Sequence, residues 1–154
     1  MPLKNTELVS ILKNLMEVCK DGEQGYKDAA DDVRDEEIQK VLLKYSHQRS
    51  IFFAELEITV RKLGGDMEFA GSVLGILHRR WMDVKFAVAG SDSYSILKEC
   101  VRGEKAAITA YEKALGRELS ADILNLVNRQ YNEIKDALEH LINIQHTLGF
   151  AADS

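Results

Sequence analysis

Apolar residues recur along this chain with the spacing of helical faces. Leu8, Leu12, Leu15 and Cys19 fall on one stripe and predict a first helix. The same periodicity continues in three later segments, and Gly64 stands where the second helix should end. The predicted helices cover residues 6–32, 36–63, 93–115 and 120–148.

The lengths of the connections predict the topology. Short loops join the first helix to the second and the third to the fourth, so each pair should form an antiparallel hairpin. The connection over residues 64–92 is much longer and contains an amphipathic segment, predicted as a short helix over 72–88. A long crossover lets the second and third helices run parallel, as in ferritin-like bundles. We therefore predict an all-α, ferritin-like four-helix bundle, with residues 1–154 as a single domain.

Composition and charge narrow the possible partners and location. The net charge of -5 opposes binding to nucleic acid or to an anionic membrane. No apolar run approaches the ~18 residues of a membrane span, and the first residues lack the pattern of a signal peptide. Two cysteines in helical segments do not form a disulfide framework. We expect a cytoplasmic protein without nucleic-acid or membrane partners.

A short motif occurs in two of the predicted helices. Residues 19–23 read C-K-D-G-E, and residues 100–104 read C-V-R-G-E. The same offset sets Arg49 of the second helix against Gln130 of the fourth. Matching positions in corresponding helices predict a duplicated helical hairpin with pseudo-twofold symmetry.

The motif places carboxylates where the core should be. Glu23 and Glu104 share the apolar faces of their helices, and His47 and Glu133 should lie at a similar depth. A buried carboxylate must be neutralised by a proton, a cationic side chain or a metal. Inward carboxylates and histidines hold di-iron or di-manganese centres in helical bundles. These four residues are therefore candidate ligands for Fe or Mn.

A second arrangement would neutralise the carboxylates without metal. Arg49 is also in core phase, four residues after Tyr45 and three before Phe52. A buried Glu–Arg network with Gln130 as its symmetric counterpart, joined by Tyr26, would satisfy both acids. We favour this network over a metal site.

Several segments together resemble one protein family. They read G-E-Q-G-Y and A-A-D-D-V in the first helix, R-S-I-F-F-A-E-L in the second, G-S-V-L-G-I-L-H-R-R-W in the crossover and C-V-R-G-E in the third helix. They resemble a bacterial ferritin-like four-helix-bundle family catalogued as a domain of unknown function. The resemblance implies a bacterial, cytoplasmic protein with a ferritin-like fold and no assigned activity.

Better-known ferritin-like proteins bind two metals through a Glu from two helices and a Glu-x-x-His from each of the others. This chain departs from that pattern, because Ile58 follows Glu55 by three residues and Asp136 follows Glu133 by three. We therefore predict a non-catalytic structural or interaction protein with a degenerate metal site. The alternative is an iron- or manganese-binding protein, and any enzyme activity would then be of the di-metal oxidase type.

The second helix carries apolar residues on two faces. Ile51, Phe53 and Ile58 are out of phase with its core stripe. Something must cover this second face, and we expect both the crossover segment and another subunit to do so. The sequence therefore predicts a homo-oligomer, a dimer or larger.

Overall fold

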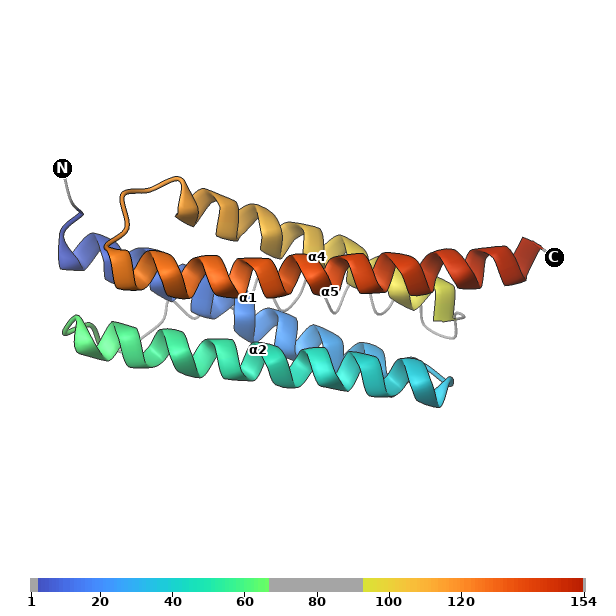
Figure 1. The fold of residues 1–154 in the computed structure, drawn as a ribbon. Helices are drawn as coiled ribbons and strands as arrows, with labels where there is room; N and C mark the ends of the chain where they lie inside the picture. The colour runs from blue at the N-terminus through green and yellow to red at the C-terminus, as the bar shows by residue number, and fades with distance from the viewer. Residues whose placement is uncertain (1–2, 67–92, 154) are drawn as a thin grey trace.

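The computed structural model describes residues 3–66 and 93–153, and these residues form four α-helices (Figure 1). The helices are α1 (Asn5–Asp32), α2 (Glu36–Lys62), α4 (Ser93–Leu115) and α5 (Ala121–Asp153). The predicted all-α four-helix bundle is confirmed. The predicted ends agree to within one residue, except that α5 continues past residue 148. The short helix expected over 72–88 lies outside the described residues.

The ends of α2 follow from local chemistry. The Asp35 carboxylate accepts hydrogen bonds from the backbone N–H groups of Glu37 and Ile38, at 2.9 and 3.0 Å, and so caps the first turn. At the other end Gly64 adopts a φ of 82°, a left-handed conformation that other residues rarely take. The helix between these caps therefore begins and ends as the sequence pattern indicates.

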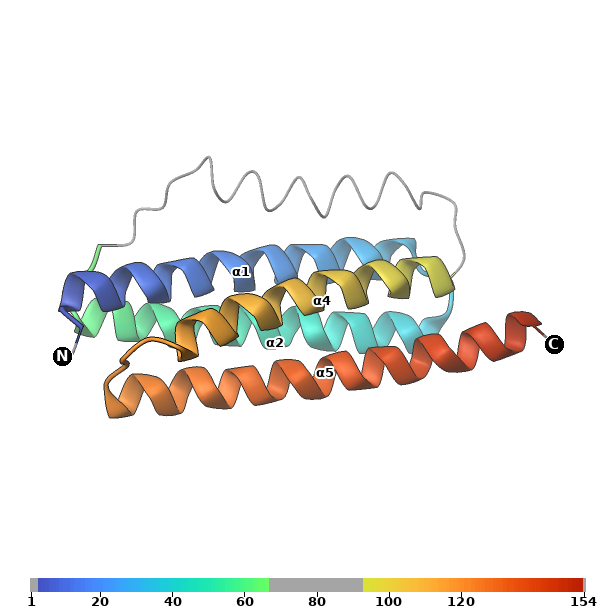
Figure 2. The ribbon, with the colours of Figure 1, turned by 90° about the horizontal axis from the view of Figure 1, so that it is seen from above.

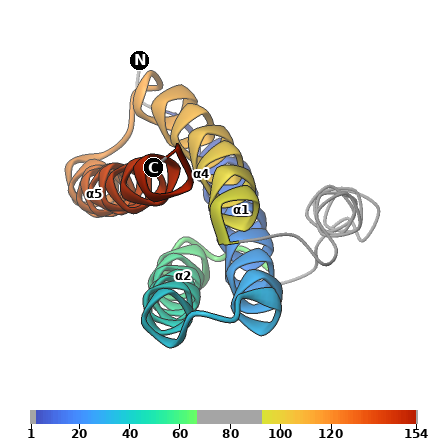
Figure 3. The same cartoon turned by 90° about the vertical axis from the view of Figure 1, so that its right-hand side faces the viewer.

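The four helices form two antiparallel hairpins that lie against each other. Figure 1 shows α1 beside α2 and α4 beside α5, with α2 and α4 running in the same direction. In the end-on view α1 and α4 lie in the middle of the bundle, and α2 and α5 lie on the same side of them (Figure 3). The view from above shows that the C-terminal end of α5 extends beyond the other helices (Figure 2). Contacts between α2 and α5 are few compared with those within each hairpin.

The apolar core has two parts. The first gathers α1 residues up to Cys19 with the C-terminal halves of α2 and α4, and the second gathers the opposite ends of those helices. Fully buried members of the first include Leu12, Leu15, Leu56 and Val127, and those of the second are Ala30, Leu42, Leu97 and Leu141. Arg49 and Glu104, both buried, lie between the residues of the two parts along α2 and α4.

None of the helices in residues 3–66 and 93–153 combines the length and apolar character that crossing a membrane requires.

Candidate functional site

An arginine and a glutamate from different hairpins form an ion pair in the middle of the bundle. Arg49 comes from α2 and Glu104 from α4, and each is only 1% exposed. Arg49 Nη1 donates to Glu104 Oε1 at 2.7 Å, and Nη2 donates to Oε2 at 2.5 Å. Two parallel bonds of this kind are the strongest form of the interaction. The pair therefore joins the two hairpins through two buried, oppositely charged side chains.

Tyr26 of α1 completes this centre. Its hydroxyl donates to Glu104 Oε2, so each carboxylate oxygen of Glu104 accepts at least one hydrogen bond. The guanidinium carbon of Arg49 also lies 5.4 Å from the centroid of the Tyr26 ring, within cation–π range. Three helices thus contribute to one network of Tyr26, Arg49 and Glu104, which we call the central network.

A glycine in α1 makes room for the arginine. A Cβ atom on Gly22 would lie 3.3 Å from Arg49 Nη1 and 3.5 Å from Arg49 Cγ. Glycine inside a helix costs ~1 kcal/mol relative to alanine, so its presence needs a reason. The close approach of Arg49 supplies that reason, because the guanidinium must pass beside the α1 backbone to reach Glu104.

Burial and charge fix the protonation states in the central network. Burial alone would lower the pKa of Arg49, but the Glu104 carboxylate raises it above its ordinary value. Burial, and then the charge of Glu104, raise the pKa of Tyr26 well above 10. At neutral pH the guanidinium is therefore a cation and the phenol a neutral donor. One cation faces one carboxylate, so the centre is balanced in charge.

A second buried network lies two helical turns away, ~10 Å along the bundle. The Tyr111 hydroxyl donates to Gln130 Oε1 at 2.7 Å and lies 3.2 Å from Cys19 Sγ. Because the single phenolic proton is used on Gln130, the thiol of Cys19 is the donor to Tyr111. Burial raises the pKa of Cys19 to about 11, which keeps this thiol protonated at neutral pH.

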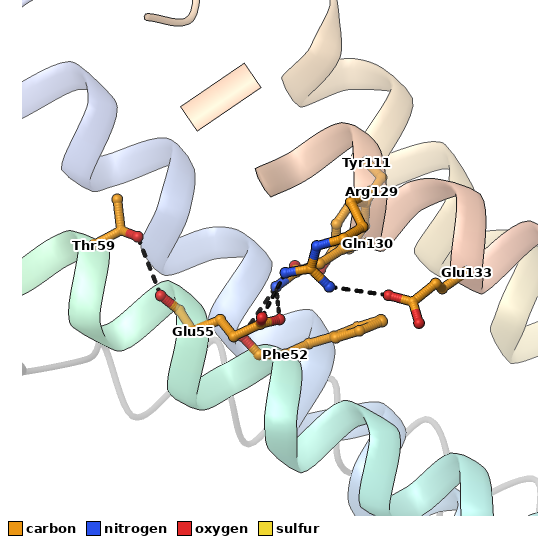
Figure 4. Close-up of polar contacts among 7 residues, drawn as sticks. All are labelled: Phe52, Glu55, Thr59, Tyr111, Arg129, Gln130 and Glu133. Carbon is orange, nitrogen blue, oxygen red and sulfur yellow. Dashed lines mark hydrogen bonds and ion pairs between the residues drawn. The ribbon is translucent and has the colours of Figure 1, made fainter. Parts of the chain in front are cut away.

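The amide of Gln130 extends the second network from α5 to α2 (Figure 4). Its Nε2 donates to the Phe52 carbonyl at 3.3 Å and to Glu55 Oε1 at 3.1 Å. Arg129 donates to Glu55 at 2.5 Å and to Glu133 at 3.1 Å. These bonds connect α2 to α5, two helices that have few contacts with each other.

Glu23 does not occupy the position expected from the repeat. Its side chain is 28% exposed and lies 3.5 Å from Lys20 of its own helix, rather than in the central network. The physical reason is the identity of its symmetric partner. Gln130 stands where a second arginine would be needed, and a neutral amide cannot neutralise another buried carboxylate. The predicted symmetry therefore extends to the positions of the motif but not to the environments of the two acids.

The other two candidate ligands also lie away from Glu104. His47 is exposed on the outer face of α2, and Glu133 lies at the surface, paired with Arg129. Among residues 3–66 and 93–153, no group of three or more His, Cys, Asp and Glu side chains is arranged to hold a metal. Better-known ferritin-like proteins hold two metals inside the bundle, and the donors in the described part of this chain are not arranged in that way.

Gln130 belongs to the second network rather than to the central one. The partners of Gln130 are Tyr111, Phe52 and Glu55, and none of them was among the predicted site residues. The sequence feature that points to the second network is the phenol of Tyr111, which lies in core phase and must find a hydrogen-bond partner when buried. The pair of Tyr45 and His140, whose Oη and Nδ1 are 2.6 Å apart, was also not predicted.

Comparison with known proteins identifies the family. Residues 7–117 match the family model described as Domain of unknown function (DUF2383). The chain belongs to this family. The match covers α2 and α4 entirely and α1 from its third residue. The DUF2383 region therefore includes Tyr26, Arg49 and Glu104. Membership of a domain family of unknown function, implied by the resemblance, is confirmed. A search of curated proteins finds no match to this chain.

Proposed function

We propose that this DUF2383 protein is a non-catalytic helical bundle with a structural or interaction role. The observation that carries the proposal is the bonding of Glu104, whose two carboxylate oxygens accept from Arg49 and Tyr26. A carboxylate in this state has no proton to transfer, and its lone pairs are directed at donors already in place. The central network then serves to hold α1, α2 and α4 together.

A metal at this centre would have to displace the guanidinium. Arg49 is as buried as Glu104, so its charge would lose the carboxylate that neutralises it and stay in an apolar environment. Removing one partner of a buried pair costs ~3–5 kcal/mol. Metal binding at Glu104 would therefore have to offset this cost before it gave any net affinity.

The proposal includes a ferritin-like ancestry and a bacterial, cytoplasmic setting. Support for the ancestry comes from the two antiparallel hairpins with parallel α2 and α4. Support for the cytoplasmic location comes from the net negative charge and from two free, buried cysteines, Cys19 and Cys100. In this account Arg49 stands where a ferritin-like relative would hold its metals.

Metal content after exposure to Fe(II) or Mn(II) tests the proposal. The purified protein is incubated with each metal, dialysed, and analysed for bound metal beside the variants Glu104→Gln and Glu133→Gln. We expect no stoichiometric metal in any of the three proteins. Equimolar metal in the wild type that is lost in Glu104→Gln and kept in Glu133→Gln would overturn the proposal in favour of an iron- or manganese-binding protein.

A further inference from the structure

The outer face of α2 carries a row of exposed aliphatic side chains. Leu43, Ile51 and Ile58 are 46%, 47% and 55% exposed, and Ala54 between them is exposed as well. At 100° per residue these positions lie opposite the buried stripe that contains Arg49. Apolar side chains that gather on one exposed face of a soluble protein mark an interaction site. We call Leu43, Ile51, Ala54 and Ile58 the outer row.

Phe53, expected on this second face, lies elsewhere. It packs against the apolar core and beneath Lys20, whose Nζ is 5.8 Å from the ring centroid. Leu43 takes its place in the exposed set. Other exposed large aliphatic side chains in the described residues are spread out, with Leu124 in the first turn of α5 and Ile142 about five turns further along. The outer row is therefore the concentrated apolar surface of the described bundle.

The spacing of the outer row suits another helix as its partner. Ile51, Ala54 and Ile58 are separated by three and then four residues, the alternation of a coiled-coil seam. His47 continues the seam four residues before Ile51. The small side chain of Ala54 lets a second helix approach closely between Ile51 and Ile58.

The charges of α2 are arranged to favour an antiparallel copy of itself. Its first turn is acidic, with Glu36 and Glu37, and its last turn is basic, with Arg61 and Lys62. A parallel pair would set like charges side by side, whereas an antiparallel pair sets each acidic end beside a basic one. In that orientation the positive end of each helix dipole also lies beside the negative end of the other, which is favourable.

We infer that α2 binds α2 of a second copy of this chain, antiparallel, through the outer row. The inference rests on the interaction role proposed above and names the partner of that role. With the two-fold axis between Ser50 and Ile51, Leu43 is level with Ile58 of the second copy. Lys62 then lies two residues, or ~3 Å along the axis, from the level of the second copy's Glu37. One self-complementary face therefore closes a dimer.

Molar mass measured by light scattering during gel filtration tests the inference. The wild type should have the mass of a dimer, and Ile51→Glu/Ile58→Glu should halve it to that of a monomer. The matched control is Leu124→Glu/Ile142→Glu, which adds the same charges at exposed positions of α5 and should stay dimeric. A monomeric wild type, or an outer-row variant that remains dimeric, would overturn the inference.

Disulfide trapping tests the orientation without disrupting the whole face. Leu43→Cys and Ile58→Cys are prepared separately, oxidised alone, and then oxidised as a mixture. The antiparallel pair predicts a linked dimer in the mixture and little in either protein alone, and native Cys19 and Cys100 are buried from the oxidant. Efficient linkage of each variant with itself indicates parallel helices and would overturn the inference.

Metal content measured on the same samples separates this inference from the proposed function. Stoichiometric metal in a dimer that the outer-row variant dissociates would overturn the proposed function and support the dimer. A metal-free monomer would overturn the dimer and leave the central network as proposed.

Discussion

Arg49 of α2 and Glu104 of α4 form two parallel hydrogen bonds, at 2.7 and 2.5 Å, inside the bundle. The residues are separated by the long connection between the hairpins, so the pair forms only when the two hairpins assemble. Each is 1% exposed, which means that each charge depends on the other for neutralisation. The two hairpins therefore meet through the central network, and substitutions in it should change the free energy of unfolding.

Glu104→Gln should destabilise the protein strongly. The substitution keeps the shape of the side chain but leaves the Arg49 cation buried without a counter-charge. A cost of ~3–5 kcal/mol in the free energy of unfolding is expected, measured by urea denaturation at neutral pH. Glu133→Gln is the control, since it removes a surface carboxylate paired with Arg129, and it should cost less than ~1 kcal/mol.

Replacing both members of the pair should behave differently from replacing one. Arg49→Met/Glu104→Leu leaves no charge in the central network, and such exchanges are often neutral or stabilising by ~1–4 kcal/mol. We expect this double variant to be more stable than Glu104→Gln by urea denaturation. Equal losses in the two proteins would contradict the view that the cost arises from an uncompensated charge.

The effect of Gly22→Ala on stability should change sign when Arg49 is replaced. In the wild type the new Cβ would lie 3.3 Å from Arg49 Nη1, and the bonds to Glu104 prevent the guanidinium from moving away. The variant should therefore be less stable, although alanine normally favours a helix by ~1 kcal/mol over glycine. In the Arg49→Met/Glu104→Leu background the same change should be stabilising. The test is the melting temperature of the wild type and of Arg49→Met/Glu104→Leu, each with and without Gly22→Ala. A higher melting temperature with Gly22→Ala in both backgrounds would show that Gly22 does not accommodate Arg49.

Gln130→Leu should cost ~1–3 kcal/mol of unfolding free energy, because it leaves the buried Tyr111 hydroxyl without its acceptor. It also removes the amide bonds to Phe52 and Glu55 that connect α5 to α2. Arg129→Gln is a comparison at the exposed end of the same network, where a cost below ~1 kcal/mol is expected. A neutral Gln130→Leu, measured by urea denaturation, would mean that the second network contributes nothing to holding the hairpins together.

Stability should fall as the pH rises above about 9, partly through Cys19. Its pKa is raised from an ordinary 9.0 to about 11, so in this range the unfolded chain loses a thiol proton that the folded chain keeps. The folded state then binds more protons, and its stability decreases with rising pH, by at most ~3 kcal/mol for two pKa units.

Cys19→Ser isolates this contribution, since serine keeps a small donor for Tyr111 and does not titrate. The variant should lose less stability than the wild type between about pH 9 and 11. Other buried groups with raised pKa, such as Cys100 and Tyr26, are common to both proteins and cancel in the difference. Identical slopes in the two proteins would contradict the assignment.

Helical periodicity predicted the four helices well because each buries one continuous stripe along its length. It also placed Arg49 and Glu104 in core phase, and a buried acid and a buried base in one bundle are expected to meet. The repeat was less reliable for Glu23, since symmetry of sequence does not supply the second cation that a second buried carboxylate needs. Only the identity of Gln130, a neutral residue, indicated that difference.

The second network could not be predicted from periodicity alone. Tyr111 and Cys19 lie on core stripes whether or not they meet, and their contact depends on the relative shift of α1 and α4 along the bundle. Likewise, the exposure of Leu43 and the burial of Phe53 depend on how α2 is rotated against its neighbours. Small rotations of this kind are fixed by packing between helices, which a pattern within one helix does not contain.

A crystal structure of the protein grown with Mn(II), with an anomalous difference map, tests the central claim most directly. We predict that the Arg49 guanidinium lies against the Glu104 carboxylate, with the Tyr26 hydroxyl beside it and no anomalous peak inside the bundle. An anomalous peak next to Glu104, with Arg49 turned away from it, would show instead that Glu104 is a metal ligand.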